Sequence, residues 1–184
     1  VVPPNRIPQG CAAITPDMLP LVELTQGQID HIVQIVPGGA ANIQDIYPLA
    51  PLQEGILFHH MLSEEGDAYI LPMLMALETR DKLDVFVDAL KAVVARHDIL
   101  RSAVVWQGLD TPVQVVHRQV ELAIEHVALD PRRDGQEQLR ERMASQGLRL
   151  IKEAQAQPWH LADVAGALAN SEMMAGRFKE ARQL

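Results

Sequence analysis

The order of predicted elements indicates an α/β or α+β sandwich. Hydrophobic periodicity predicts a helix, a strand, another helix and then several strands, an order that excludes a helical bundle. Val and Ile together number 27 before Asp130 but only two after it, and ten of the twelve prolines also precede Asp130. We therefore expect a strand-competent segment joined near residues 131–135 to a strand-poor helical tail.

The N-terminal region is predicted to be an extended linker followed by a short helix. Five prolines fall within residues 1–24, and each removes a backbone donor and fixes φ. Thr25 and Gln28 then form a capping-box pattern, and apolar residues follow at helical spacing. Pro37-Gly38-Gly39 ends this predicted amphipathic helix.

A second helix is predicted over residues 52–65, with Gly66 closing it. The apolar run 69–77 resembles a buried strand, in which Pro72 would suit an edge or a bulge. Asp81 is then expected to cap a strong amphipathic helix. One apolar stripe runs along that helix: Leu83, Phe86, Val87, Leu90 and Val94.

The following segments are candidate strands. Residues 103–107 and 112–117 are rich in valine and are separated by a turn containing Gly108. The alternating apolar residues of 120–124 predict a third strand. From Gln136 the apolar spacing becomes helical, and an αα-hairpin is expected beyond Pro158.

Charge and composition narrow the functional classes. The 184 residues carry 16 basic and 24 acidic side chains, a net charge of −8, so binding to nucleic acid by charge is not expected. No apolar run is long enough to span a bilayer, so we expect no membrane partner and a cytoplasmic location. The single cysteine, Cys11, forms no internal disulfide and suggests no metal site.

Adjacent histidines are the leading candidates for chemistry. Side chains of successive helical residues diverge by about 100°, so one of His59 and His60 should point inward and the other outward. The inward histidine could act as a general base, with Asp67 fixing its tautomer. The alternative is a core histidine bonded to a backbone carbonyl, together with an exposed His60 that meets Glu64.

A second cluster lies at residues 96–101 and has an ordinary structural explanation. Arg96 and His97 suit the C-terminal end of a helix, where the macrodipole favours cations. Arg101 could bridge to a neighbouring acid and fix the turn. We therefore expect these residues to support the fold.

Three motifs in order resemble a known family. Residues 42–60 (NIQDIYPLAPLQEGILFHH) resemble the opening motif of condensation domains in nonribosomal peptide synthetases, and residues 96–101 (RHDILR) resemble their second core motif. Residues 59–67 (HHMLSEEGD) are similar to the N-terminal histidine motif of the dual epimerization/condensation subtype. The Pro-rich stretch 15–22 also resembles the linker that follows a carrier domain.

This resemblance implies a fold, partners and a reaction. It implies part of one half of a chloramphenicol-acetyltransferase-like sandwich, with an appended helical tail. Residues 1–41 would be the Pro-rich linker and short helix, 42–142 the N-terminal part of the condensation domain, and 143–184 the tail, which weakly resembles a tetratricopeptide helix pair. The family forms peptide bonds between thioesters and amines carried on phosphopantetheine arms of partner carrier domains, so no cofactor is expected on this chain itself.

The family's main active-site motif, His-His-x-x-x-Asp-Gly, does not occur in the sequence. His59 and His60 cannot serve as that motif, because Asp-Gly does not follow at the required spacing. We therefore expect a truncated domain that is inactive alone and in which His59, His60 and Asp67 carry the subtype's chemistry. A non-catalytic docking module and a gene remnant are the alternatives.

Overall fold

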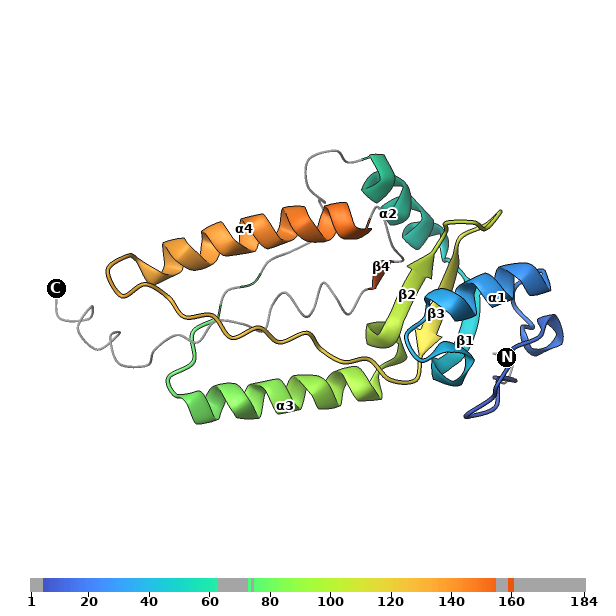
Figure 1. Ribbon diagram of the computed structural model, residues 1–184, viewed down its shortest axis with the longest axis horizontal. Coiled ribbons are helices and arrows are strands. Elements are labelled where there is room, and N and C mark those ends of the chain that lie inside the picture. Colours follow the sequence, from blue (N-terminus) through green and yellow to red (C-terminus); the bar gives the residue numbers. More distant parts are fainter. Residues whose placement is uncertain (1–4, 63–72, 74, 155–158, 161–184) are drawn as a thin grey trace.

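The computed structural model describes residues 5–62, 73, 75–154 and 159–160. Within them, a four-stranded antiparallel sheet has the order β1-β3-β2-β4 (Figure 1). The strands are β1 (Ile43–Pro48), β2 (Ser102–Val105), β3 (Val113–His117) and β4 (Trp159–His160). The helices are α1 (Gln26–Ile35), α2 (Pro51–Leu62), α3 (Arg80–Arg96) and α4 (Gly135–Ala154), and short 3-10 turns occupy Pro16–Met18, Gly39–Asn42 and Asp98–Arg101. The predicted mixture of helices and strands is confirmed.

The two faces of the sheet are covered by different elements, because side chains alternate along each strand. Ile46, Val115 and Ala103 lie side by side across three strands, and Ile46 and Val115 face α1 in the main hydrophobic core. In the next row, Tyr47, Gln114 and Val104 point to the opposite face. Val104 there packs in a smaller cluster with residues from α2 and its N-terminal approach.

The N-terminal segment 5–24 forms one 3-10 turn and otherwise has no helix or strand. It is more than a connection, since Ile7, Ile14 and Leu19 are buried in the main core. Asn5 Nδ2 donates to the Gln44 carbonyl of β1 at 2.6 Å. The segment is therefore an irregular chain with several turns, not a simple extended linker, and its apolar side chains complete the core beside α1.

The capping box predicted for α1 is confirmed. The Thr25 side chain accepts from the Gln28 backbone N–H, while the Gln28 side chain accepts from the Thr25 backbone N–H. On its buried face α1 presents Ile29 and Ile32, each 0% exposed. The helix is thus fixed both by its own N-terminus and by the sheet beneath it.

The N-terminal cap of α3 differs from the prediction. Thr79 is the capping residue, and its side chain accepts from the Lys82 backbone N–H at 3.3 Å. Asp81 is the second residue of the helix, where a carboxylate still interacts well with the helix dipole. The predicted stripe faces inward but is only half-buried from Leu83 to Leu90, and Val94 is its fully buried member.

Two strand predictions need correction. Strand β1 was not predicted, because Asp45 and Pro48 are poor strand residues and the bulge after Ile43 breaks the alternation. Conversely, residues 120–124 are extended with alternating burial, but they belong to no strand within the described part of the chain. Alternation predicts a pleated conformation, whereas a strand also needs a neighbour to pair with.

Several predicted features lie wholly or partly outside the described residues. The predicted strand 69–77 is one, and where it is described Met73 and Met75 are exposed, contrary to a buried strand. The helix predicted from Gln136 is confirmed as α4, whereas the predicted helices after residue 160 lie outside. Figure 1 shows α3 and α4 projecting away from the side of the sheet that carries α1.

Candidate functional site

Helix α2 places its two histidines on different sides, as predicted. His60 is 2% exposed, and its ring meets the Trp106 ring edge-on at a centroid distance of 6.2 Å. His59 is exposed and lies edge-on to Phe58 at 5.9 Å. The alternative with an exposed His60 is therefore wrong, because the 100° step places His60 on the same side as the buried Leu57.

Asp67, the proposed partner of the inward histidine, lies outside the described residues. The surroundings of His60 are those of a small second core. Leu49, Leu57 and Val104 are buried together, and Trp106 packs against them. The His60 ring is therefore enclosed, whereas the His59 side chain is exposed.

A polar network connects α2 to the sheet beneath it. Gln53, on the inward side of α2, donates from Nε2 to Gln114 Oε1 at 2.7 Å. Gln114 is 3% exposed and also hydrogen-bonds the Tyr47 side chain. Tyr47 bonds Ser102 as well, and Ser102 Oγ donates to the Asp98 carbonyl at 2.8 Å. These hydrogen bonds hold α2 in a defined position on the sheet, because each side chain of the network bonds to a residue on a different element.

The titratable groups on this face sit in a partly dehydrated, acidic environment. Burial raises the pKa of Tyr47, and the nearby Asp45 and Asp98 carboxylates raise it further, whereas the hydrogen bonds with Ser102 and Gln114 lower it. Burial also raises the pKa of Asp45, as does Asp98, while the Ile46 backbone N–H opposes the change. Both shifts favour the protonated form of the group, which can donate a hydrogen bond.

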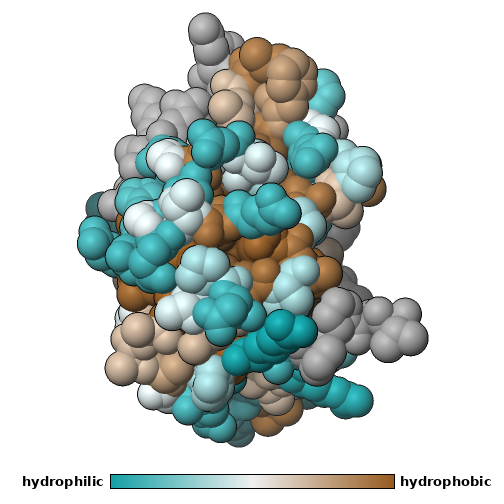
Figure 2. Space-filling view, turned by 90° about the vertical axis from the view of Figure 1, so that its right-hand side faces the viewer, coloured by the Kyte–Doolittle hydropathy of each residue, from teal (hydrophilic) through white to brown (hydrophobic). Residues whose placement is uncertain are grey.

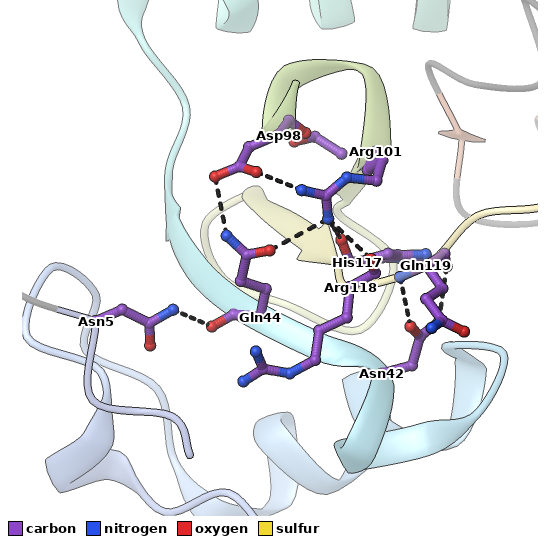
Figure 3. Close-up of polar contacts among 9 residues, drawn as sticks. Asn5, Asn42, Gln44, Asp98, Arg101, His117, Arg118 and Gln119 are labelled. Carbon is purple, nitrogen blue, oxygen red and sulfur yellow. Dashed lines mark hydrogen bonds and ion pairs between the residues drawn. The ribbon is translucent and has the colours of Figure 1, made fainter. Parts of the chain in front are cut away.

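Arg101 forms the strongest polar cluster of the site (Figure 3). Its guanidinium is buried and binds the Asp98 carboxylate, the carbonyls of His117 and Arg118, and Gln44 Oε1 at 3.2 Å. Gln44 in turn donates to the other Asp98 oxygen at 2.9 Å. The prediction that Arg101 bridges to a neighbouring acid and fixes the turn is confirmed.

His97 and Arg96 have the structural positions expected of a helix end. The His97 backbone N–H closes the last turn of α3 on the Val93 carbonyl at 3.1 Å, and its own carbonyl accepts from Leu100 at 3.0 Å. Arg96 lies in the last turn of α3, where a cation is favoured. Both residues are exposed.

Tyr47, Gln53 and Gln114 were not predicted as site residues. Two of them fall within the motif at 42–60, but only the sheet register reveals that they meet. Gln114 carried a usable signal, since a glutamine in the middle of a valine-rich strand must find a hydrogen-bond partner when buried.

The described residues contain no group of three or more His, Cys, Asp or Glu side chains placed to hold a metal ion. In the same part of the chain, no helix has the length and apolarity required to cross a membrane. The contacts described above define the site as a polar face of the sheet covered by the histidine-bearing helix α2.

Comparison with known proteins assigns this arrangement to a family. The condensation domain family model matches residues 43–162. The chain is 54% identical over 145 residues to malpinin synthetase of Mortierella alpina and 51% identical over 129 residues to malpibaldin synthetase of the same organism. It is also 36% identical over 121 residues to a component of the linear gramicidin synthase of Brevibacillus parabrevis.

The chain belongs to the condensation domain family. The three alignments cover 78%, 70% and 66% of this chain, but the chain spans only about 2% of the length of each relative. The predicted resemblance to the N-terminal part of a condensation domain of nonribosomal peptide synthetases is confirmed. The family match continues through α4 to β4, whereas the boundary placed at residue 142 stays a prediction.

Proposed function

We propose that this chain supplies the N-terminal part of a condensation domain with a chloramphenicol-acetyltransferase-like sandwich fold. In a nonribosomal peptide synthetase, that domain would join an upstream aminoacyl or peptidyl thioester to a downstream amine. Both substrates would arrive in the cytoplasm on phosphopantetheine arms of carrier domains. The family match across residues 43–162 is the observation that carries this proposal.

The reaction defines what the protein must do. The amine nitrogen attacks the thioester carbonyl, the new C–N bond forms, the C–S bond breaks, and the amine proton must be removed while the thiol leaves protonated. This requires two carriers held in register and a base near the nitrogen. The 184 residues contain no His-His-x-x-x-Asp-Gly, so we propose that this segment alone does not catalyse condensation.

The dual epimerization/condensation subtype is the finer proposal, and it rests on residues 59–67. Inversion of an upstream α-carbon requires removal of its proton from one side and return of a proton on the other. His59 is exposed and could make such a transfer, whereas His60 is packed against Trp106 and would position α2. Asp67 would fix the tautomer of the reacting histidine.

A docking function is favoured by one specific observation. Leu52, Phe58, Met61 and Leu62 on the outer side of α2 are between 57% and 77% exposed. Figure 2 shows apolar atoms at the top of the molecule, where the C-terminal end of α2 lies. An exposed group of large apolar side chains on one helix is normally covered, so this face suits contact with another part of a synthetase.

The first experiment separates catalysis from docking. The purified chain is mixed with a donor carrier domain loaded with an aminoacyl thioester and an acceptor carrier domain loaded with another, and the products are analysed by intact-protein mass spectrometry. We expect no dipeptidyl product. Dipeptide formation would overturn the proposed inactivity, and carrier binding without product would support docking.

The second experiment tests the subtype. Residues 43–162 of this chain replace the matching segment of malpinin synthetase, and stereochemistry is read by chiral analysis of the released peptide. We expect His59→Ala to reduce inversion by about 100-fold or more while condensation continues. Glu54→Ala, an exposed position of α2 outside the apolar set, is the matched control. Equal loss of both reactions in the His59 variant would reject a role specific to inversion.

A further inference from the structure

The extended residues 120–124 have the alternating side-chain pattern of a strand, but within the described residues they lack the backbone hydrogen bonds that pair a strand with its neighbour. Val120, Leu122 and Ile124 are half-buried, while Glu121 and Ala123 are exposed. Among the described residues, no backbone-to-backbone hydrogen bond involves this segment. Within the described part of the chain, its N–H and C=O groups therefore have no ladder partner and can pair with an added strand.

Asn42 holds the start of this segment in place, as a neighbouring strand would. Its side chain accepts from the Gln119 backbone N–H at 2.9 Å and donates to the Gln119 carbonyl at 3.1 Å (Figure 3). The Arg118 backbone N–H also donates to the Asn42 carbonyl at 2.7 Å. The chain thus leaves β3 in a fixed, extended direction.

An open groove of about 920 Å³ runs beside the segment. Its lining includes residues 117–122, Lys91, Val94 and Ala95 of α3, and Pro37 and Gly38. The walls combine apolar side chains with the exposed strand-like backbone. These features suit an extended peptide better than a compact small molecule.

The charge on the groove is opposite to that of its surroundings. Residues 1–130 carry seven basic and 17 acidic side chains, yet three of the seven basic residues line this groove. They are Lys91, Arg101 and Arg118, and Glu121 is the acidic residue of the lining.

Two of these cations are open to an added anion. Arg118 donates to the carbonyls of Ile7 and Pro8 at 2.9 and 3.2 Å, and it forms no ion pair within the described part of the chain. Lys91 pairs only loosely with the exposed Asp88, at 3.6 Å. Arg101 is different, because Asp98 already neutralises it.

We propose that this groove binds an extended acidic peptide segment of a partner protein, which pairs with residues 120–124 as an additional strand. Backbone hydrogen bonds supply part of the affinity, and the carboxylates of the peptide contact Lys91 and Arg118. Apolar side chains on the alternate positions of the peptide pack on Val94 and Leu122. Binding requires no turnover, so this proposal and the condensation function can fail independently.

Titration of the isotope-labelled chain with a capped hexapeptide of alternating valine and glutamate tests the proposal. We expect amide chemical-shift changes centred on residues 119–124, and hydrogen exchange there at least about tenfold slower at saturation. A peptide with lysine in place of glutamate and one with proline in place of valine are the controls. Equal binding of the lysine peptide, or no protection of residues 120–124, would reject the proposal.

Charge reversal supplies the matched protein variants. Lys91→Glu should weaken binding of the valine-glutamate peptide by roughly tenfold, because it places a carboxylate on the groove wall. Lys82→Glu makes the same change in net charge on an exposed position of α3 outside the groove lining. Circular dichroism checks that both variants fold, and an equal loss in both would mean that overall charge, not this groove, governs binding.

Discussion

The two faces of the sheet differ in what they contribute. Toward α1, among the described residues, twelve buried hydrophobic side chains form one continuous cluster. Toward α2, only three buried hydrophobic residues cluster, and Tyr47, Gln114 and Ser102 lie on the same side. The apolar face can stabilise the fold by burial alone, whereas the polar face depends on hydrogen bonds with defined direction and so fixes where α2 and its histidines lie.

The largest expected effect comes from the apolar face. Ile32→Ala should lower the free energy of unfolding by about 2–5 kcal/mol, because a cavity in a continuous core collapses only partly. Leu57→Ala on the other face should cost less, since its smaller cluster lies closer to solvent. Urea unfolding followed by circular dichroism measures both.

Val93→Ala is the control for this comparison, because Val93 is 45% exposed on α3. It should change stability by less than about 0.5 kcal/mol. A larger loss for Leu57→Ala than for Ile32→Ala would contradict the assignment of stability to the α1 face.

A smaller and more local effect is expected from the polar face. Gln114→Leu keeps the side-chain size but removes the partner of both Gln53 and Tyr47, and should cost about 1–3 kcal/mol. Hydrogen exchange should become faster in α2 and stay unchanged in α1. Gln34→Leu on the exposed side of α1 is the matched control, and uniform acceleration in both helices would show that Gln114 merely supports the whole core.

The sequence predicted the parts of the molecule that depend on local physics. The capping box at Thr25, the inward and outward split at residues 59–60 and the Arg101 bridge all follow from helical spacing or from neighbours within a few residues. Long-range partners were not predictable in this way. Nothing near Gln114 in the sequence indicates Gln53 or Tyr47, because their contact depends on the sheet register.

The same distinction explains the errors in strand prediction. Strand β1 exists because β3 pairs with it, despite Asp45 and Pro48, while residues 120–124 have the pattern of a strand and no partner within the described residues. Likewise, helical periodicity alone could not predict that residues 159–160 would pair with β2. Strand pairing depends on two segments, so the pattern of one segment predicts its conformation but not its partner.

The smallest expected effect tests the electrostatics of the polar face. The pKa of Asp45 is raised in the folded protein, so the folded state binds its proton more tightly than the unfolded state does. Because of this raised pKa, the free energy of unfolding decreases as the pH rises through it. Well below the ordinary pKa of 3.8, Asp45 is protonated in both states and this destabilisation is absent. Asp45→Asn should therefore increase the free energy of unfolding at pH 7.

The gain should be within about 0.5 kcal/mol, as is typical of substitutions outside the core. The asparagine oxygen can still accept from the Ile46 backbone N–H, which Asp45 binds at 2.9 Å, so this local hydrogen bond is retained. Thermal unfolding between pH 3 and pH 7 should show the gain fading toward the acid end. Glu23→Gln removes the same charge from an exposed site, and an equal gain there would mean that net charge, and not the half-buried position beside Asp98, sets the effect.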